Sequence, residues 1–264
     1  MVEDNEFQGQ VALITGGGEG IGRAIAQAMA SRKVRLAICG RRSEPLETAA
    51  KELSQAGIEV LDIPCDVTRK EEVERMVNRV IRKFGRLDIL VNNAGMSGRT
   101  PIDDPDDSKW LNIIRVNLNG TYFCSKLVLP HMVERRYGRI VNISSVLGRF
   151  GVAGYVAYCT AKHGLLGFTK SLALEVASQG ITVNSICPTW VDTVMARQCI
   201  AETAAFLGVN PETFREEAIK AIPIQRMAEA DEIAGLTVFL CSRPASAITG
   251  QAINVCGGAT AGVA

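Results

Sequence analysis

The sequence has no excess of charge of either sign. Its 264 residues include 29 Lys+Arg and 28 Asp+Glu, which gives a formal net charge of +1. Proteins that bind nucleic acid usually carry a strongly basic face. The near balance therefore argues against nucleic-acid binding, while a hydrophobic content of 47% provides ample material for a buried core.

The sequence has no long uncharged hydrophobic run, and we expect no leader peptide. The first ten residues, MVEDNEFQGQ, are acidic and polar, whereas a signal peptide begins basic and continues apolar. The longest uncharged stretch, residues 244–264, contains proline, glycine and amide residues, so it cannot form a spanning helix. We therefore expect a soluble cytoplasmic protein that does not enter a membrane.

No CxxC pair occurs among the eight cysteines, although that spacing is typical of metal and redox motifs. Cys39 and Cys187 lie inside apolar runs, where a free thiol packs as a small hydrophobic group. The pattern predicts reduced, buried cysteines rather than disulfides or metal ligands. No metal site is expected.

Short runs rich in Val, Ile and Leu recur along the chain. Their lack of period-two alternation suits strands that are buried on both faces of a parallel sheet. Between the runs, residues 21–32 and 70–85 have the apolar spacing of amphipathic helices. Strand and helix alternate without a break in composition, which predicts one doubly wound α/β domain over residues 1–264. The expected strands cover residues 11–16, 35–40, 60–67, 88–95, 139–145, 181–188 and 252–258.

Residues 194–222 interrupt this alternation. They separate the last two expected strands and have a helical but weakly patterned sequence. An insertion at the carboxyl end of a strand, where ligands bind in such sheets, is a candidate substrate lid. A plain connecting helix explains the pattern equally well.

The first expected strand ends in TGGGEGIG, residues 15–22. The fingerprint G-x-G-x-x-G is absent, and Gly16, Gly20 and Gly22 form G-x-x-x-G-x-G instead. Glycines at these positions permit a tight turn and let backbone N–H groups approach a pyrophosphate at a helix N-terminus. A loop without a ligand is the alternative, but its place between a strand and an amphipathic helix favours dinucleotide binding.

The end of the second expected strand discriminates between nucleotides. An NAD site usually has a carboxylate there for the ribose 2′-hydroxyl, but this strand ends in Arg41 and Arg42, with no carboxylate before Glu44. Two guanidinium groups suit a 2′-phosphate. NADP(H) is favoured and NAD(H) is the alternative, since Glu19 in the glycine turn opposes phosphate binding.

Tyr158 and Lys162 stand four residues apart, one above the other on one face of a helix. A nearby ammonium favours the ionised phenol, so we expect Lys162 to lower the pKa of Tyr158 and make it a general acid or base. Ser145 follows an expected strand and its hydroxyl could face the same cleft.

These motifs together resemble the classical short-chain dehydrogenase/reductase family, and within it the 3-oxoacyl and polyketide ketoreductases. The resemblance covers almost the whole chain and implies a single Rossmann-type domain with a seven-stranded parallel sheet, flanked by helices on both faces and usually assembled as a homotetramer. The motifs are TGGGEGIG (15–22), Asp66-Val67, NNAG (92–95), Asn117 in VNLNG, ISS (143–145), YCTAK (158–162) and residues 188–193.

The resemblance implies a catalytic set of four residues. Tyr158 exchanges a proton with the substrate oxygen, and Ser145 polarises the carbonyl, so both contact the substrate. Lys162 holds the nicotinamide ribose, and Asn117 positions a water that links Lys162 to solvent.

The resemblance also implies the contacts to the dinucleotide. Asp66 and Val67 meet the adenine, Asn93 lines the ribose, and Val191 and Thr193 meet the nicotinamide carboxamide. The full expected set is Thr15, Gly16, Gly20, Ile21, Gly22, Arg41, Arg42, Asp66, Val67, Asn93, Tyr158, Lys162, Val191 and Thr193.

The expected activity is an NADPH-favouring interconversion of a ketone and a secondary alcohol. The alternatives are an NAD-linked alcohol dehydrogenase that works oxidatively and a catalytically idle nucleotide-binding subunit. The side chains expected around the substrate are mainly apolar, which suggests a hydrophobic ketone. They are Met96, Ser97, Val146, Leu147, Trp190 and residues 194–222.

Overall fold

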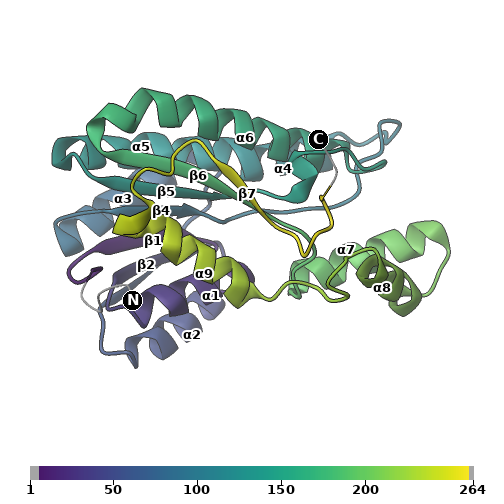
Figure 1. Cartoon of the computed structure of the whole chain (residues 1–264), viewed down its shortest axis with the longest axis horizontal. Coiled ribbons are helices and arrows are strands. Elements are labelled where there is room, and N and C mark those ends of the chain that lie inside the picture. Colours follow the sequence, from purple (N-terminus) through teal and green to yellow (C-terminus); the bar gives the residue numbers. More distant parts are fainter. Residues whose placement is uncertain (1–5, 262–264) are drawn as a thin grey trace.

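A seven-stranded parallel sheet forms the centre of the protein in a computed structural model that describes residues 6–261. The strands lie in the order β3-β2-β1-β4-β5-β6-β7 (Figure 1). The strand order reverses between β1 and β4, which leaves a crevice at their carboxyl ends. The strands are β1 (Val11–Thr15), β2 (Arg35–Gly40), β3 (Val60–Pro64), β4 (Ile89–Asn92), β5 (Gly138–Ile143), β6 (Ile181–Pro188) and β7 (Ala252–Val255).

Every strand coincides with one of the apolar runs of the sequence, so the predicted fold class is confirmed. All residues of β1, β4, β5 and β6 are buried. Side chains therefore face apolar surroundings on both sides of the sheet, which explains the absence of period-two alternation.

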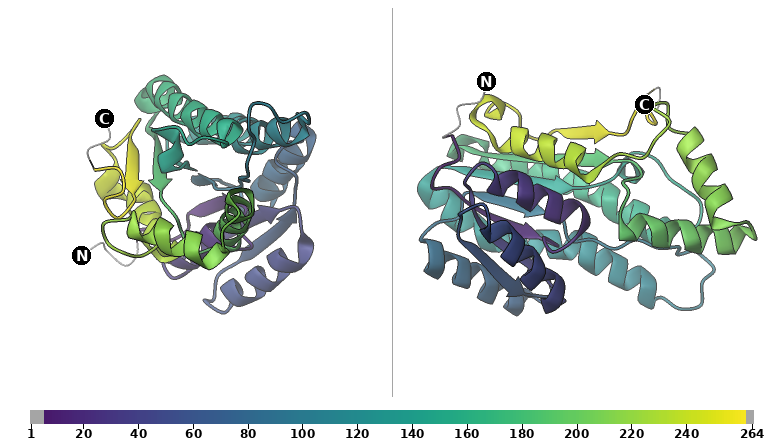
Figure 2. Two further views of the ribbon diagram at one scale, coloured as in Figure 1. Left: turned by 90° about the vertical axis from the view of Figure 1, so that its right-hand side faces the viewer. Right: turned by 90° about the horizontal axis from the view of Figure 1, so that it is seen from below.

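Helices cover both faces of the sheet, as Figure 2 shows. Each layer buries an apolar stripe, for example Ile25 and Met29 on one face and Val73 and Val77 on the other. One layer contains α1 (Gly20–Ala30), α2 (Ser43–Ser54) and α9 (Ala230–Cys241), and the other contains α3 (Lys70–Phe84), α5 (Gly120–Arg135) and α6 (Val156–Val176).

All eight cysteines are free and buried, as their apolar surroundings in the sequence predict. In residues 6–261 no helix combines the length and the apolar composition that crossing a membrane requires.

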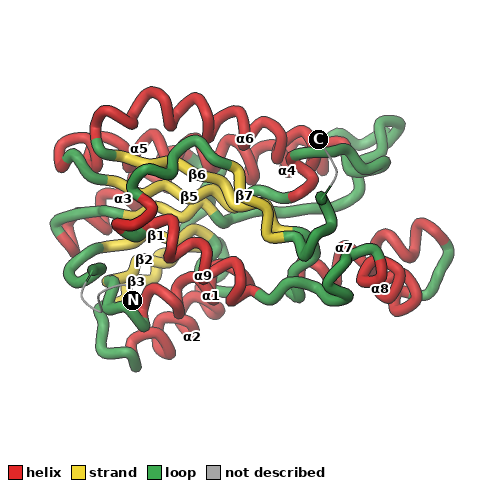
Figure 3. The backbone as a smooth tube through the Cα atoms, viewed as in Figure 1, coloured by secondary structure: helices red, strands yellow, loops and turns green. Residues whose placement is uncertain are grey.

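Residues 194–220 form two helices beyond the carboxyl edge of the sheet, α7 (Val194–Leu207) and α8 (Pro211–Lys220) (Figure 1). Thr193 caps α7 by accepting the Ala196 N–H at 3.3 Å, and Asn210 caps α8 by accepting the Glu212 N–H at 2.8 Å. Figure 3 shows loops from the strand ends reaching this side of the molecule. The pair therefore stands at the edge where ligands bind in such sheets.

Candidate active site

A cavity of about 960 Å³ opens at the carboxyl ends of the central strands. Its volume is at the upper end of the range for small-molecule sites. Most of the residues that the sequence singles out line it. They are Gly16, Gly20, Ile21, Arg41, Arg42, Asp66, Val67, Asn93, Asn117, Ser145, Tyr158, Lys162, Val191 and Thr193.

Thr15 and Gly22, which the sequence also assigns to the cofactor, lie behind the cavity wall. The Thr15 hydroxyl accepts the N–H groups of Asn93 at 3.0 Å and Ala94 at 2.9 Å, which ties β1 to the end of β4. A Cβ on Gly22 would stand 2.2 Å from the Gly16 carbonyl oxygen. Both residues therefore shape the glycine turn from beneath, and they do not line the cavity.

Asn93 holds the glycine turn in place. Its Nδ2 donates to the carbonyl oxygens of Thr15 at 2.9 Å and Gly16 at 3.2 Å. Gly16 has a φ of +66°, a conformation that glycine adopts readily. Because these bonds occupy the amide donors of Asn93, its role in positioning the turn is visible in the structure, and a ribose contact stays a prediction.

The two arginines after β2 differ in their surroundings. Arg42 forms an ion pair with Glu19 of the glycine turn, although both side chains are exposed. Within residues 6–261 no carboxylate lies at ion-pair distance from Arg41, which is also exposed and lines the cavity. Arg41 therefore has the guanidinium that is free to meet a phosphate.

Asp66 and Val67, after β3, also line the cavity. The Asp66 carboxylate accepts the backbone N–H of Thr68 at 2.9 Å and its hydroxyl at 2.8 Å. Val67 is buried and packs against Gly120, where an added Cβ would come within 2.8 Å of the valine side chain. These contacts give the loop after β3 a defined shape.

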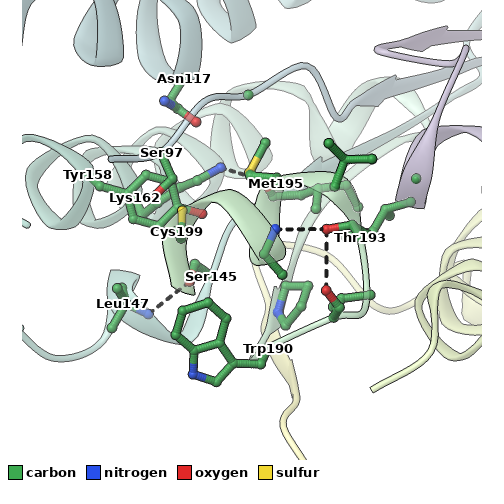
Figure 4. Close-up of a pocket in the computed structure, with 18 of the residues that line it drawn as sticks. Ser97, Asn117, Ser145, Leu147, Tyr158, Lys162, Trp190, Thr193, Met195 and Cys199 are labelled. Carbon is green, nitrogen blue, oxygen red and sulfur yellow. Dashed lines mark hydrogen bonds between the residues drawn. The ribbon is translucent and has the colours of Figure 1, made fainter. Parts of the chain in front are cut away.

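Tyr158 and Lys162 project from α6 into the other end of the cavity (Figure 4). The Lys162 Nζ donates to the Ile143 carbonyl oxygen at 2.8 Å and lies 5.5 Å from the centroid of the Tyr158 ring. Burial of Lys162 lowers its pKa to about 8, because the core solvates the ammonium poorly.

The pKa of Tyr158 moves in the opposite direction from the prediction. Burial raises it above its ordinary value, because the phenolate loses hydration. The neighbouring Ser145 hydroxyl favours the phenolate and opposes this rise in pKa, whereas Lys162 is not among the main causes of the shift. The i, i+4 spacing correctly predicts that Tyr158 and Lys162 lie close together. The expected lowering of the Tyr158 pKa is wrong, because the effect of burial dominates.

Ser144 and Ser145 have different surroundings. The Ser144 hydroxyl donates to the Lys162 carbonyl oxygen at 3.3 Å and is buried. Ser145 caps a short 3₁₀ turn by accepting the Leu147 N–H at 3.1 Å, and its hydroxyl lies beside Tyr158 (Figure 4). The structure therefore places Ser145 beside the tyrosine.

Asn117 lies in a π-helical segment, Arg115–Asn119, between α4 (Ser108–Ile114) and α5. Its Nδ2 donates to the carbonyl oxygens of Met96 at 2.8 Å and Ile113 at 2.9 Å. Its Oδ1 is buried and accepts no hydrogen bond from residues 6–261. A Cβ added to Gly95 would lie 3.0 Å from this oxygen and 4.0 Å from the Lys162 Nζ, so both groups border the space beside Gly95.

The substrate end of the cavity contains most of the residues expected there, namely Ser97, Val146, Leu147, Trp190 and part of 194–222. Met96 is an exception, since its side chain packs in a small cluster around Ile113 and Ala157 and does not line the cavity.

Arg99 and Tyr155 line the cavity but were not predicted. Arg99 follows the NNAG motif at the carboxyl end of β4, a position that could have signalled it. Tyr155 precedes Tyr158 by nearly one helical turn and hydrogen-bonds Thr203 of α7 at 2.6 Å.

A cavity at the switch point of a Rossmann-type sheet, with a serine, a tyrosine and a lysine at one end, defines a class of dinucleotide-dependent oxidoreductases. The family model for short chain dehydrogenases matches residues 10–204. The 3-oxoacyl-[acyl-carrier-protein] reductase FabG of Haemophilus influenzae is 38% identical over 252 residues, which cover 96% of this chain and 98% of that protein.

Solved structures give the same picture. Actinorhodin polyketide ketoreductase with NADPH has a TM-score of 0.92 and 39% identity, covering 98% of this chain and 99% of that one. NAD⁺-bound xylitol dehydrogenase has a TM-score of 0.92 and 32% identity, covering 96% and 100%. The chain belongs to the short-chain dehydrogenase/reductase family and is an oxidoreductase that acts on CH–OH and C=O groups.

Proposed function

We propose that the protein is an NADPH-dependent ketoreductase that converts a hydrophobic ketone to a secondary alcohol. The observation that carries the proposal is the convergence of Ser145, Tyr158 and Lys162 in one cavity with a glycine turn at its other end. The ketoreductase likeness, with NADPH in one solved relative, supports the choice of substrate class and cofactor.

The residues of the cavity fit a dinucleotide. Glu19, the N-cap residue of α1, makes no side-chain capping bond, so the first N–H groups of that helix remain available to a diphosphate. In this proposal Arg41 and Arg42 provide positive charge for a 2′-phosphate, and Lys162 and Asn93 meet the nicotinamide half; all four residues line the cavity. The bound cofactor supplies a hydride from C4 of the reduced nicotinamide.

Tyr158 acts as the general acid in this proposal. Because its pKa is raised by burial, the phenol is protonated at neutral pH and can donate to the oxygen of a carbonyl. The Ser145 hydroxyl beside it donates a hydrogen bond where negative charge develops on that oxygen.

Lys162 and Asn117 resupply the proton. A pKa of about 8 allows Lys162 to lose and regain a proton near neutral pH. The buried Asn117 Oδ1, which has no protein donor in the described part of the chain, suits a water that connects Lys162 to solvent.

Oxidation of an alcohol with NAD⁺ is the second candidate. Two observations favour it, the ion pair that ties Arg42 to Glu19 and the likeness to a NAD⁺-bound xylitol dehydrogenase. Comparing kcat/KM for NADPH and NADH separates the candidates, and a clear preference for NADH would contradict the proposal.

Three further features belong to the same proposal. Residues 194–222 act as a lid, supported by their place over the cavity and by the lack of any buried residue in α8. The protein functions in the cytoplasm as a homotetramer. Light scattering on purified protein tests the assembly, and a monomer would contradict it.

Replacement of Tyr158 by Phe tests the catalytic assignment. Tyr158→Phe removes the proton donor, so reduction of a ketone by NADPH should fall at least 1,000-fold, roughly the upper part of the range for general acid catalysis. NADPH binding, measured by fluorescence, should change less than about threefold, because the variant keeps the ring.

Tyr122→Phe on α5 is the matched control, since that hydroxyl accepts only the exposed Lys126 ammonium and lies outside the cavity. Near-normal turnover in Tyr158→Phe would refute the assignment. Absence of NADPH oxidation in the unchanged protein with a broad panel of ketones would favour an idle nucleotide-binding subunit.

A further inference from the structure

We propose that Arg99 binds an anionic oxygen group, a carboxylate or a phosphate, at the end of the substrate remote from its carbonyl. The proposal rests on the ketoreductase function and specifies its substrate class. It concerns a residue of the loop after β4 that lines the same cavity as Arg41 and Arg42.

Arg99 lines the cavity with its guanidinium unpaired. The side chain is half-buried, and in residues 6–261 no protein acceptor takes a hydrogen bond from its five N–H donors. The Glu202 carboxylate forms no ion pair with the Arg99 guanidinium. It accepts the Lys109 ammonium at 3.1 Å and the backbone N–H of Arg99 at 3.4 Å.

The guanidinium lies between two aromatic rings. Its Cζ lies 3.5 Å from the centroid of the Phe206 ring and 5.9 Å from that of Tyr155. A Cβ on Gly154 would come within 2.6 Å of Nη2, so this glycine leaves the space that the guanidinium fills. Stacked guanidinium groups keep their in-plane donors available, and this geometry suits bidentate binding of a carboxylate or phosphate.

Two hydrogen bonds join the loop that carries Arg99 to the start of α6. The Thr100 N–H donates to the Gly154 carbonyl oxygen at 2.7 Å, and the Thr100 hydroxyl accepts the Ala157 N–H at 3.1 Å. Arg99 is therefore positioned relative to the helix that carries Tyr158. The fold therefore fixes the distance between a carbonyl held at Tyr158 and an anion bound at Arg99. This distance selects substrates of matching length.

In residues 6–261 none of the other charged side chains that line the cavity forms an ion pair with Arg99. Glu217 on α8 also lines the cavity, but it is exposed and forms no ion pair with Arg99. Lys162 donates to a backbone carbonyl beside Tyr158. A substrate with an apolar body and one anionic end matches the apolar walls of Val146, Leu147 and Trp190.

Matched acids and esters test the proposal. The probes are 3-oxobutanoate, 4-oxopentanoate and 5-oxohexanoate, each compared with its methyl ester, which keeps the ketone and removes the charge. A ketone phosphate compared with the unphosphorylated ketone distinguishes phosphate from carboxylate. The unchanged enzyme should prefer one class of anion over its neutral partner by at least tenfold in kcat/KM, chiefly through KM.

Variants then assign the preference to Arg99. Arg99→Gln should lower the acid-to-ester ratio at least tenfold, and Arg99→Lys should restore part of it. Arg82→Gln, at an exposed position of α3 that does not line the cavity, is the control and should leave the ratio unchanged. Calorimetry of the acid and ester with NADP⁺-loaded enzyme measures the same preference without turnover.

Two results would overturn the inference. One is equal binding of every anion and its neutral partner by the unchanged enzyme. The other is an equal loss for acid and ester in Arg99→Gln, which would mean that Arg99 only holds α7 through Phe206. Either result leaves ketone reduction standing, whereas continued turnover in Tyr158→Phe would remove the proposed function itself.

Discussion

At the scale of a single residue, the burial of Lys162 lowers the stability of the folded protein. Lys162 is almost fully buried, and its pKa falls from 10.5 to about 8 because burial penalises the ammonium. Below pH 8 the lysine is charged in both the folded and unfolded states, and the folded state bears the cost of desolvation. Between pH 8 and 10.5 only the unfolded state stays protonated, so this group makes stability rise with pH.

Lys162→Met should therefore stabilise the protein while removing activity. The free energy of unfolding at pH 7 should rise by about 1–3 kcal/mol, because an apolar side chain of similar length replaces a buried charge. Urea denaturation at pH 7 and at pH 10 measures the effect, which should shrink at the higher pH. Lys170→Met, at an exposed position of α6, is the control. A less stable Lys162→Met at pH 7 would contradict the burial argument.

We expect Arg41 and Glu19 to influence cofactor preference in opposite directions. Arg41→Ala should raise the KM for NADPH about 10- to 100-fold, the effect of losing a charge-assisted hydrogen bond to phosphate, with a small change for NADH. Glu19→Gln should lower the KM for NADPH about two- to fivefold, because it releases Arg42 from an exposed ion pair.

Steady-state kinetics with both cofactors measures these shifts in KM. Arg82→Ala, on the exposed face of α3, is the control for loss of a positive charge. Equal losses for NADPH and NADH in Arg41→Ala would place the 2′-phosphate elsewhere.

At the scale of secondary-structure elements, Asp88 joins β1 to β4, the two strands that flank the switch point. It is fully buried, and Oδ2 accepts the Val11 N–H at 2.9 Å and the Arg86 Nε–H at 2.7 Å. The second oxygen accepts from Arg86 at 2.7 Å, and Arg135 lies 3.9 Å away. The carboxylate is thus satisfied on both oxygens, although Arg86 and Arg135 are partly exposed.

Asp88→Ala should lower the free energy of unfolding by about 3 kcal/mol, because it leaves the Val11 N–H buried without an acceptor and Arg86 without its partner. Asp88→Asn should lose about half as much, since one acceptor remains. Thermal denaturation measures both, with Asp103→Ala in an exposed loop as the control. A melting temperature within about 1 °C of the unchanged protein in Asp88→Ala would contradict this role.

The glycine turn and the helix with Tyr158 show how much of the site was predictable from the sequence. Local spacing placed the glycine turn between β1 and α1 and put Tyr158 and Lys162 on one face, because these relations involve only neighbouring residues. Thr15 and Gly22 are expected to bind the cofactor, and their contact with it stays a prediction. Neither lines the cavity, because the packing of β1 against β4 decides which residues of the turn face it. The missed Arg99 acquires its place only through Tyr155 and Phe206, which are far away in sequence.

At the scale of the whole molecule, the sheet and the α7–α8 pair differ in how they are held. The strands β1, β4, β5 and β6 are buried along their whole length, whereas α8 has no buried residue. α7 buries Ala196, Cys199, Ile200, Thr203 and Ala204, and Thr203 also hydrogen-bonds Tyr155 at 2.6 Å, so α8 is held less firmly than α7. Segments with few buried apolar contacts open at low free energy, as a lid requires.

Amide hydrogen exchange should therefore separate the two regions. The amides of α8 should exchange at least 100-fold faster than those of β6, because opening them breaks few buried contacts. Addition of NADP⁺ with an alcohol product should slow exchange in α7 and α8, and leave exchange in α3, on the opposite part of the molecule, nearly unchanged. Equal protection of α8 and β6 without ligand would contradict a lid.

The amino-acid sequence by itself determined the elements, the family motifs and the pairing of Tyr158 with Lys162. All three depend on residues close together in the chain and on the hydrophobic period. Only the tertiary structure decided which motif residues face the cavity, that Glu19 pairs with Arg42, and that Arg99 stands unpaired beside the substrate end. It also decided the direction of the Tyr158 pKa, because burial is produced by the packing of distant segments.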